Sequence, residues 1–208
     1  FVDPTGLLAC LSGDILQFLA LLTRFTGIRI KGSSLHKLRG ECPCLTLNDF
    51  DISGSDGSVL ADTFLDILGS DTPIHLKSSM DDLRIALGGN IIDLDGINKQ
   101  ILDPADFDSL LNSSSVPRDI AQLMARNHLA HELGEALITQ TNSNAISRSR
   151  ALPTGGYEDV ENTTYGTLQH PEAINRYENP GLSPTGLQRT GDFNRAEYQD
   201  RAGHRFEL

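Results

Sequence analysis

Apolar residues recur at helical spacing in three parts of the chain, and each part predicts a helix. The first part covers residues 8–30, where apolar residues follow one another three and four positions apart. The second is short and covers residues 59–68. The third, residues 118–140, has apolar residues on nearly every face, so we expect it to be buried among other elements. Ser115 is a suitable N-cap for this helix, and Pro117 suits its first turn.

Strand patterns are concentrated in the middle of the chain. Residues 74–78 alternate between apolar and polar, and residues 90–95 form a β-prone run after two glycines, so we expect a hairpin or a small sheet here. Residues 31–60 are irregular up to the second helix, and residues 102–113 predict a turn followed by a short helix. Beyond residue 140 proline and glycine recur, which predicts loops with one short helix near residues 170–178.

Composition narrows the class of protein. The 208 residues, 38% apolar and 22% charged, suit a soluble globular protein with one core. The longest apolar run, residues 7–22, is interrupted by Asp14 and Gln17 and is too short and polar to span a bilayer, so no membrane partner is expected. No basic segment precedes it, so no secretory signal is expected. The net charge of -11 disfavours nucleic acid as a partner, because an acidic surface repels phosphate.

The chain has three cysteines, Cys10, Cys42 and Cys44. An odd number without regular spacing is a poor disulfide framework, so we expect a protein that works in a reducing compartment. Cys42 and Cys44 are a weak metal motif, because no second pair follows at a suitable distance.

The candidate chemistry lies in the longest predicted helix, in the segment HLAHELGEAL (128–137). It resembles the zinc-protease motif HExxH, with Glu135 in place of the second histidine. His131 and Glu135 are four residues apart and therefore project from the same face of a helix. A carboxylate is an acceptable zinc ligand, and Glu132 would take the proton from the attacking water. The alternative is an ordinary helix in which His131 is a core histidine.

A catalytic zinc usually has three protein ligands and one open position. We choose His170 as the third ligand because it lies just ahead of the short helix predicted near residues 170–178, and His128 is the alternative. In the loop between, Tyr157 is a candidate catalytic residue that would stabilise an oxyanion. The metal ligands expected from the sequence are thus His131, Glu135 and His170, and the expected cofactor is Zn²⁺.

Two stretches resemble one family of proteins. FVDPTGL (1–7) resembles the DPxGL junction that closes the core of RHS/YD-repeat proteins, which include polymorphic bacterial toxins and the C components of Tc insecticidal complexes. HELGEAL (131–137) followed by HPEAINRYEN (170–179) resembles metallopeptidase domains that form C-terminal toxins of such proteins, with HExxH or HExxE motifs. This second resemblance covers roughly residues 90–190 and departs from HExxH at Glu135, where a carboxylate ligand makes the metal a weaker Lewis acid.

The resemblance implies a zinc-dependent hydrolase, specifically a metallopeptidase, acting as a secreted toxic effector. Its partners would be an RHS/Tc shell that encapsulates and delivers it into the target-cell cytoplasm, a protein substrate there, and an immunity protein in the producer. The chain would divide into a junction remnant (1–7), a toxin domain (8–188) and a peripheral C-terminal tail (189–208). We expect an α+β, zincin-like fold, in which a small β-sheet packs on the long metal-binding helix and the C-terminal part is rich in loops.

Two other functions remain open from the sequence. Glu158 and Glu161 invite comparison with ADP-ribosyltransferase toxins, although the strand motif and early arginine of those enzymes are not evident. The other alternative is a non-enzymatic effector that binds a target protein, in which Glu135 marks a site that has lost its metal.

Overall fold

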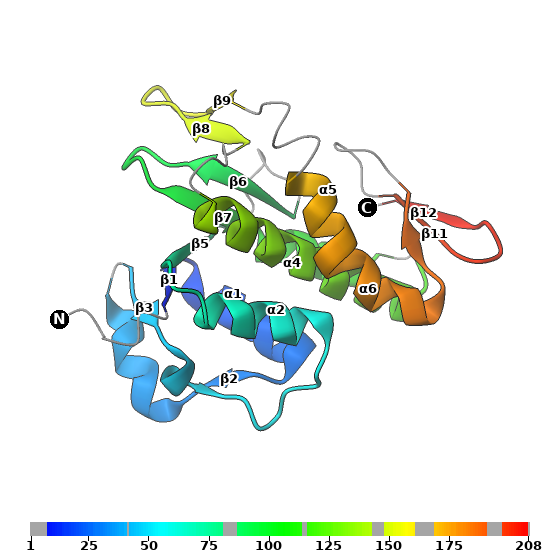
Figure 1. Ribbon diagram of the computed structural model, residues 1–208, viewed down its shortest axis with the longest axis horizontal. Helices are drawn as coiled ribbons and strands as arrows, with labels where there is room; N and C mark the ends of the chain where they lie inside the picture. Colours follow the sequence, from blue (N-terminus) through cyan, green and yellow to red (C-terminus); the bar gives the residue numbers. More distant parts are fainter. Residues whose placement is uncertain are drawn as a thin grey trace.

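The chain has an α/β fold in which helices pack against a seven-stranded mixed sheet (Figure 1). The structure, a computed structural model, describes residues 8–40, 42–80, 87–113, 116–142, 148–160, 169–190 and 197–207. The strands of the main sheet are β1 (Ala9–Gly13), β3 (Cys44–Leu45), β5 (Ile74–Ser78), β6 (Gly88–Ile92), β7 (Asn98–Leu102), β8 (Ser149–Ala151) and β9 (Tyr157–Asp159). Their order is β3-β1-β5-β7-β6-β8-β9. The pairs β1–β5, β5–β7 and β6–β8 are parallel, and the others are antiparallel.

Helical elements follow the strands along the chain. The α-helices of the described residues are α1 (Ile15–Thr26), α2 (Val59–Leu68), α3 (Pro104–Leu111), α4 (Arg118–Thr141), α5 (His170–Ala173) and α6 (Asn179–Leu182). Tighter or wider turns form η1 (Gly32–Arg39), η2 (Leu47–Asp49), η4 (Ile174–Glu178) and η5 (Ser183–Thr185). Two small sheets complete the fold: β2 (Arg29–Ile30) pairs with β4 (Phe50–Asp51), and β11 (Glu197–Gln199) lies between β10 (Gln188–Arg189) and β12 (Arg205–Glu207). None of the described helices is both long and apolar enough to cross a membrane.

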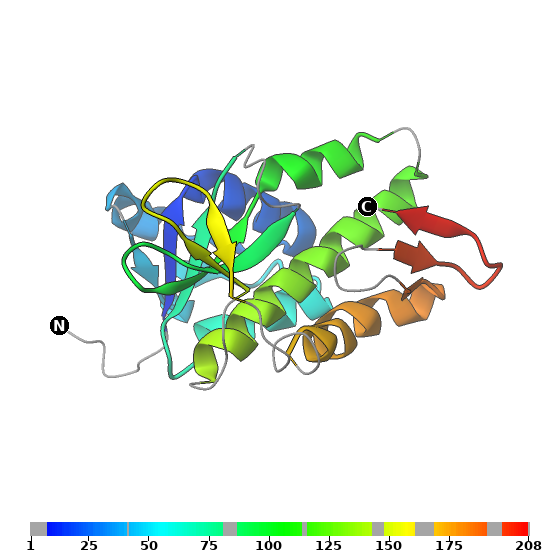
Figure 2. The same ribbon diagram turned by 90° about the horizontal axis from the view of Figure 1, so that it is seen from above.

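Helix α4 occupies the centre of the molecule. It contacts β5, β6 and β7 on one side and the α5–α6 segment on another, and α2 and α3 also pack against it. Figures 1 and 2 show the α5–α6 segment running alongside α4. The β11–β12 strands lie near the α6 end of that segment. Side chains of β5 alternate between buried and partly exposed positions, as in a strand with one buried face. Leu76 is buried, while the neighbouring Lys77 is partly exposed.

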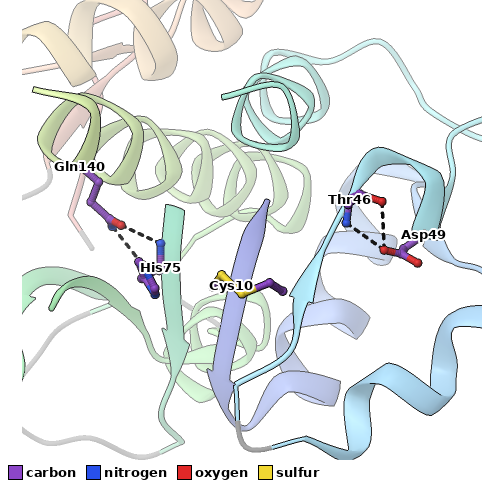
Figure 3. The surroundings of a disulfide bond; sticks show 6 residues. Cys10, Thr46, Asp49, His75 and Gln140 are labelled. Atoms are coloured by element: carbon purple, nitrogen blue, oxygen red, sulfur yellow. Dashed lines mark hydrogen bonds between the residues drawn. A yellow bond between two sulfur atoms is a disulfide. The ribbon is translucent and has the colours of Figure 1, made fainter. Parts of the chain in front are cut away.

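A side chain fixes the C-terminal end of α4 to the sheet. The Oε1 atom of Gln140 accepts a hydrogen bond from the backbone N–H of His75 at 2.7 Å, and its Nε2 donates to the backbone carbonyl of His75 at 3.0 Å. The amide of Gln140 thus pairs with β5 as another strand would. Figure 3 shows this pair beside β1 and β5. The contact sets the position of α4 relative to the sheet.

Several predicted elements are confirmed. The helix at residues 59–68 and the strand at residues 74–78 have the predicted bounds. The long helix runs from Arg118 to Thr141. The expected helix near residues 170–178 is observed and continues through a π-helical turn to Leu182.

The sheet is larger than the small one predicted, because it also contains β1, β3, β7, β8 and β9. The predicted helix at residues 8–30 was too long at both ends, because residues 9–13 form strand β1, α1 runs only from Ile15 to Thr26, and Arg29–Ile30 form β2. Gly13, with φ of 73°, turns the chain between β1 and α1. The run ACLSG is apolar enough to merge with the pattern of the helix that follows, so the change from strand to helix is not visible in the sequence.

The expectation that the three cysteines provide no disulfide framework was also wrong. Cys10 of β1 and Cys44 of β3 lie opposite each other in antiparallel strands and form a disulfide (Figure 3), while Cys42 is free and exposed. Cys44 is therefore not available for a metal motif with Cys42. The pairing depends on β1 and β3 meeting in the sheet, and the spacing of 34 residues gives no sign of it.

Reducing the Cys10–Cys44 disulfide is expected to lower the free energy of unfolding by about 3–4 kcal/mol, because the bond closes a loop of 34 residues. Urea denaturation with and without dithiothreitol measures the effect. The Cys42→Ser variant should respond to the reductant as the wild type does. Three reactive thiols in unreduced, denatured protein, rather than one, would contradict the disulfide.

Asp49 stabilises the segment around β3 and β4 and supplies a second prediction. Burial raises the pKa of Asp49, but its hydrogen bonds with Lys37, Thr46 and Ser34 lower it to about 2. Because this folded pKa lies below the unfolded value of 3.8, the charge contributes stability above about pH 4 that is lost as the pH falls toward 2. The contribution is about 2 kcal/mol. The stability difference between wild type and Asp49→Asn should shrink by about 1.5 kcal/mol between pH 6 and pH 2.5, because the folded carboxyl is still partly ionised at pH 2.5. A difference independent of pH would contradict it.

Candidate metal centre

The middle turns of α4 carry the ionisable side chains of the candidate site. These are His128, His131, Glu132 and Glu135, and each is at most 5% exposed. Burial of such groups is unfavourable unless each finds a partner, so their surroundings decide what they can do.

Glycines on both sides allow the α5–α6 segment to approach α4 closely. A Cβ atom added to Gly134 of α4 would overlap the ring of Tyr177 in η4, so this ring packs directly against the backbone of α4. A Cβ atom added to Gly181 of α6 would overlap the side-chain amide of Asn127 in α4. A larger residue at either glycine would push the two segments apart. Their close approach brings His170, at the start of α5, against α4.

Three side chains form a group that could hold a metal ion. His131 Nε2 lies 3.2 Å from Oε1 of Glu135, and Nδ1 of His170 lies 2.5 Å from the same oxygen. One possible ligand atom from each residue lies within 4.8 Å of the other two, and all three residues are buried. These are the residues chosen from the sequence as ligands. In the described part of the chain, the alternative third ligand, His128, is not a member of the group.

Glu135 is ionised in this environment. Burial by itself raises the pKa of its carboxyl, but the charge and hydrogen bond of His131, followed by those of His170, hold the pKa of Glu135 well below its usual value. An ionised carboxylate between two imidazole rings is a suitable donor for a divalent cation.

Glu132 is held between its own helix and the sheet. Its Oε1 lies 3.0 Å from Nε2 of His128, one turn earlier in α4. Its Oε2 accepts a hydrogen bond from Nε2 of Gln100 in β7, and the same carboxylate occupies the space that a side chain at Gly88 in β6 would need. The candidate proton acceptor therefore has one fixed orientation, and the absence of a side chain at Gly88 makes room for it.

His128 has a different role from the two ligand histidines. Burial lowers its pKa, but hydrogen bonds with Glu132 and Glu178 outweigh this effect and raise the pKa of His128 to about 9. Protonated imidazole has no free lone pair for a metal. His128 therefore acts as a buried cation, which is consistent with His170 as the third ligand.

Three further residues of the site were not assigned a role from the sequence: Glu178, Arg189 and Tyr198. Glu178 is fully buried at the end of η4, and its Oε2 lies 2.7 Å from Nη1 of Arg189 and 3.4 Å from Nδ1 of His131. The hydroxyl of Tyr198 donates a hydrogen bond to the other oxygen of Glu178. The spacing of eight positions from His170 to Glu178 places both on one side of a helix, and this was the available sequence signal.

The pKa shifts in the group of Glu178, Arg189 and Tyr198 indicate an ionised Glu178 and a neutral Tyr198. Burial raises the pKa of Glu178, but the hydrogen bond to His128 and the positive charges around it hold the pKa well below its usual value. Burial and the charge of Glu178 raise the pKa of Tyr198 well above its usual value, so its hydroxyl keeps its proton and donates. The C-terminal residues, predicted to be a peripheral tail, thus place the side chains of Arg189 and Tyr198 in the interior.

Tyr157, predicted to be catalytic, lies on β9 at the edge of the main sheet, where it pairs with Ala151. Tyr198 is a described tyrosine whose hydroxyl reaches the site, through its hydrogen bond to Glu178. Glu158 is exposed and forms an ion pair with Arg150 at 3.1 Å, whereas Glu161 lies outside the described residues.

The charges of the site leave room for a cation. Glu132, Glu135 and Glu178 are three buried carboxylates, and Arg189 and protonated His128 offset two of them. One negative charge remains when the two ligand imidazoles are neutral. Two imidazole nitrogens and one carboxylate oxygen form a donor set that zinc accepts. The residues therefore fit a divalent metal ion, whose identity the donor set alone does not fix.

Comparisons with known proteins give this chain no family. No protein-family model matches it, and searches of curated proteins and of solved structures find no match. The functional argument therefore depends on the residues of the site.

Gly134→Ala is expected to destabilise the protein, because the added methyl group overlaps the ring of Tyr177. Overpacking of this kind costs about 1–3 kcal/mol, which exceeds the roughly 1 kcal/mol that alanine gains over glycine in a helix. Urea denaturation gives the free energy of unfolding. The control is Gly32→Ala, since no heavy atom lies within 4 Å of a Cβ added at Gly32. In a Tyr177→Ala background the effect of Gly134→Ala should largely vanish; an unchanged effect would contradict the proposed overlap.

Proposed function

We propose that this chain is a zinc-dependent hydrolase, specifically a metallopeptidase. The observation that carries the proposal is the buried group of His131, Glu135 and His170, whose ligand atoms lie within 4.8 Å of one another. Two of these residues are four apart on α4, which is the arrangement that gives zincins two ligands from one helix. We also propose, on the same basis, that the fold is zincin-like.

His131, Glu135 and His170 would hold the metal. A bound zinc would polarise the substrate carbonyl and lower the pKa of water. Glu132 would accept a proton from the attacking water at its carboxylate and pass it to the leaving amine. His128 and Gln100 keep this carboxylate in one orientation, as proton transfer requires. Tyr157 remains a predicted catalytic residue.

The biological setting that we propose is that of a toxic effector domain of an RHS/Tc-type protein. It is supported by the resemblance of residues 1–7 to the DPxGL junction and of residues 131–137 and 170–179 to toxin metallopeptidases. Residues 1–7 lie outside the part of the chain that the structure describes. A protein substrate, a delivering shell and an immunity protein are proposed on the same basis.

One observation favours a second candidate. His131, Glu135 and His170 are between 1% and 6% exposed, and closed metal sites are typical of structural zinc. A non-enzymatic effector with a structural ion at the same site is therefore the alternative. The two candidates agree on metal binding and differ on the role of Glu132.

Purified protein is expected to contain about one zinc ion per chain and to lose it in the His131→Ala variant, because that variant removes one of three ligands. Mass spectrometry of metals measures the content directly. The matched control is His36→Ala, which changes an exposed histidine of η1 and should keep the metal. No metal in the wild type after incubation with excess zinc would refute both of these candidates and favour a non-enzymatic effector whose site has lost its metal.

Glu132→Gln is expected to retain the metal and to reduce cleavage of a denatured protein substrate by at least about 100-fold, the typical contribution of a general base. Glutamine keeps the size of the side chain and removes its proton affinity. Comparison of metal content and peptide release in the same preparation separates the two effects. Cleavage at the wild-type rate by Glu132→Gln would contradict the mechanism, and absence of cleavage in both proteins would favour the structural ion.

A further inference from the structure

Glu178 is placed to determine how His131 presents its ligand nitrogen. The two ring nitrogens of His131 face opposite carboxylates: Nε2 lies 3.2 Å from Oε1 of Glu135, and Nδ1 lies 3.4 Å from Oε2 of Glu178. A neutral imidazole carries its proton on one nitrogen and a lone pair on the other. A metal ion held by Nε2 would require the lone pair of that nitrogen, so the proton of the neutral ring would then lie on Nδ1. Nδ1 is buried without a hydrogen-bond partner among the described residues, and it faces the carboxylate of Glu178.

Glu178 is itself held in place by the C-terminal part of the chain. Arg189 of β10 contacts Oε2 at 2.7 Å, and Tyr198 of β11 donates a hydrogen bond to Oε1. The backbone N–H of Arg189 also donates to Oδ1 of Asn179, the residue after Glu178, at 3.4 Å. All three side chains of the Glu178–Arg189–Tyr198 group are almost completely buried. Such a network leaves the carboxylate little freedom to rotate away from His131.

We propose that Glu178 is a positioning residue of the metal centre, and that Arg189 and Tyr198 hold its carboxylate against His131. The inference depends on the proposed metal site. It extends that site to Arg189 and Tyr198, which lie on strands of the C-terminal sheet. Strands β10 and β11 would then be part of the functional unit. A metal-ligating histidine commonly donates its second ring N–H to a carboxylate, which fixes its tautomer and raises its basicity.

The principal test is the affinity for zinc, measured by competition with a chelator. Glu178→Gln should bind zinc about 10–100-fold more weakly than the wild type, the usual effect of removing such a partner. The matched control is Asp49→Asn, which also converts a buried, paired carboxylate to an amide, but beside β3 and β4. It should lose stability and keep its zinc affinity to within about twofold.

A second variant covers the case in which Glu178→Gln does not fold. Tyr198→Phe leaves the pair of Glu178 with Arg189 intact and removes only the hydroxyl that donates to the carboxylate. We expect it to fold and to bind zinc more weakly than the wild type. Wild-type affinity in Tyr198→Phe, together with wild-type affinity or failure to fold in Glu178→Gln, would overturn the proposal.

The tautomer of His131 provides a readout that a purely structural role of Glu178 would not change. In ¹⁵N spectra of zinc-loaded wild-type protein, Nδ1 of His131 should carry the proton and Nε2 should bind the metal. Metal binding through Nδ1 in the wild type would overturn the proposal while leaving the metallopeptidase function intact. A wild type that binds no zinc would overturn both, so the two failures are distinguishable.

Discussion

Burial of charge along α4 is the constraint on which the rest of the structure depends. Glu132, Glu135 and Glu178 are each at most 4% exposed, and an ionised carboxylate without partners is strongly disfavoured in such surroundings. Each one is matched by a group from a different element: Gln100 from β7, His170 from α5 and Arg189 from β10. Satisfying these carboxylates therefore joins the sheet, the second helical segment and the C-terminal strands to α4.

The parts of the site that could be predicted are those governed by local periodicity. The spacing of His131 and Glu135 places both on one helical face wherever the helix packs, so the pair could be recognised from ten residues. His170 was chosen because it precedes a second helical pattern, and the close approach at Gly134 and Tyr177 brings it to the expected place. The helix itself was evident because apolar residues surround it on nearly every face.

The parts that could not be predicted depend on contacts between distant segments. Strand β1 joins the sheet through parallel pairing with β5, more than 60 residues later, and its disulfide partner is fixed by the same sheet. Arg189 and Tyr198 lie in a region whose composition resembles an exposed tail, and their burial follows from Glu178, a single acidic residue. The sequence does not show that Glu178 is buried, so it does not show that this carboxylate needs partners.

The distribution of the site along the chain has a consequence for the order of folding. Gly88 and Tyr198, which both contact the carboxylates beside α4, are separated by about half of the sequence. Contacts between such distant residues form slowly, because a long loop must close before they contribute stability. During synthesis or vectorial transport, the helix with His131 and Glu135 exists well before the residues that brace it arrive. Under the proposed function, capture of the metal is a late event, and it reports that nearly the whole chain has reached its native arrangement.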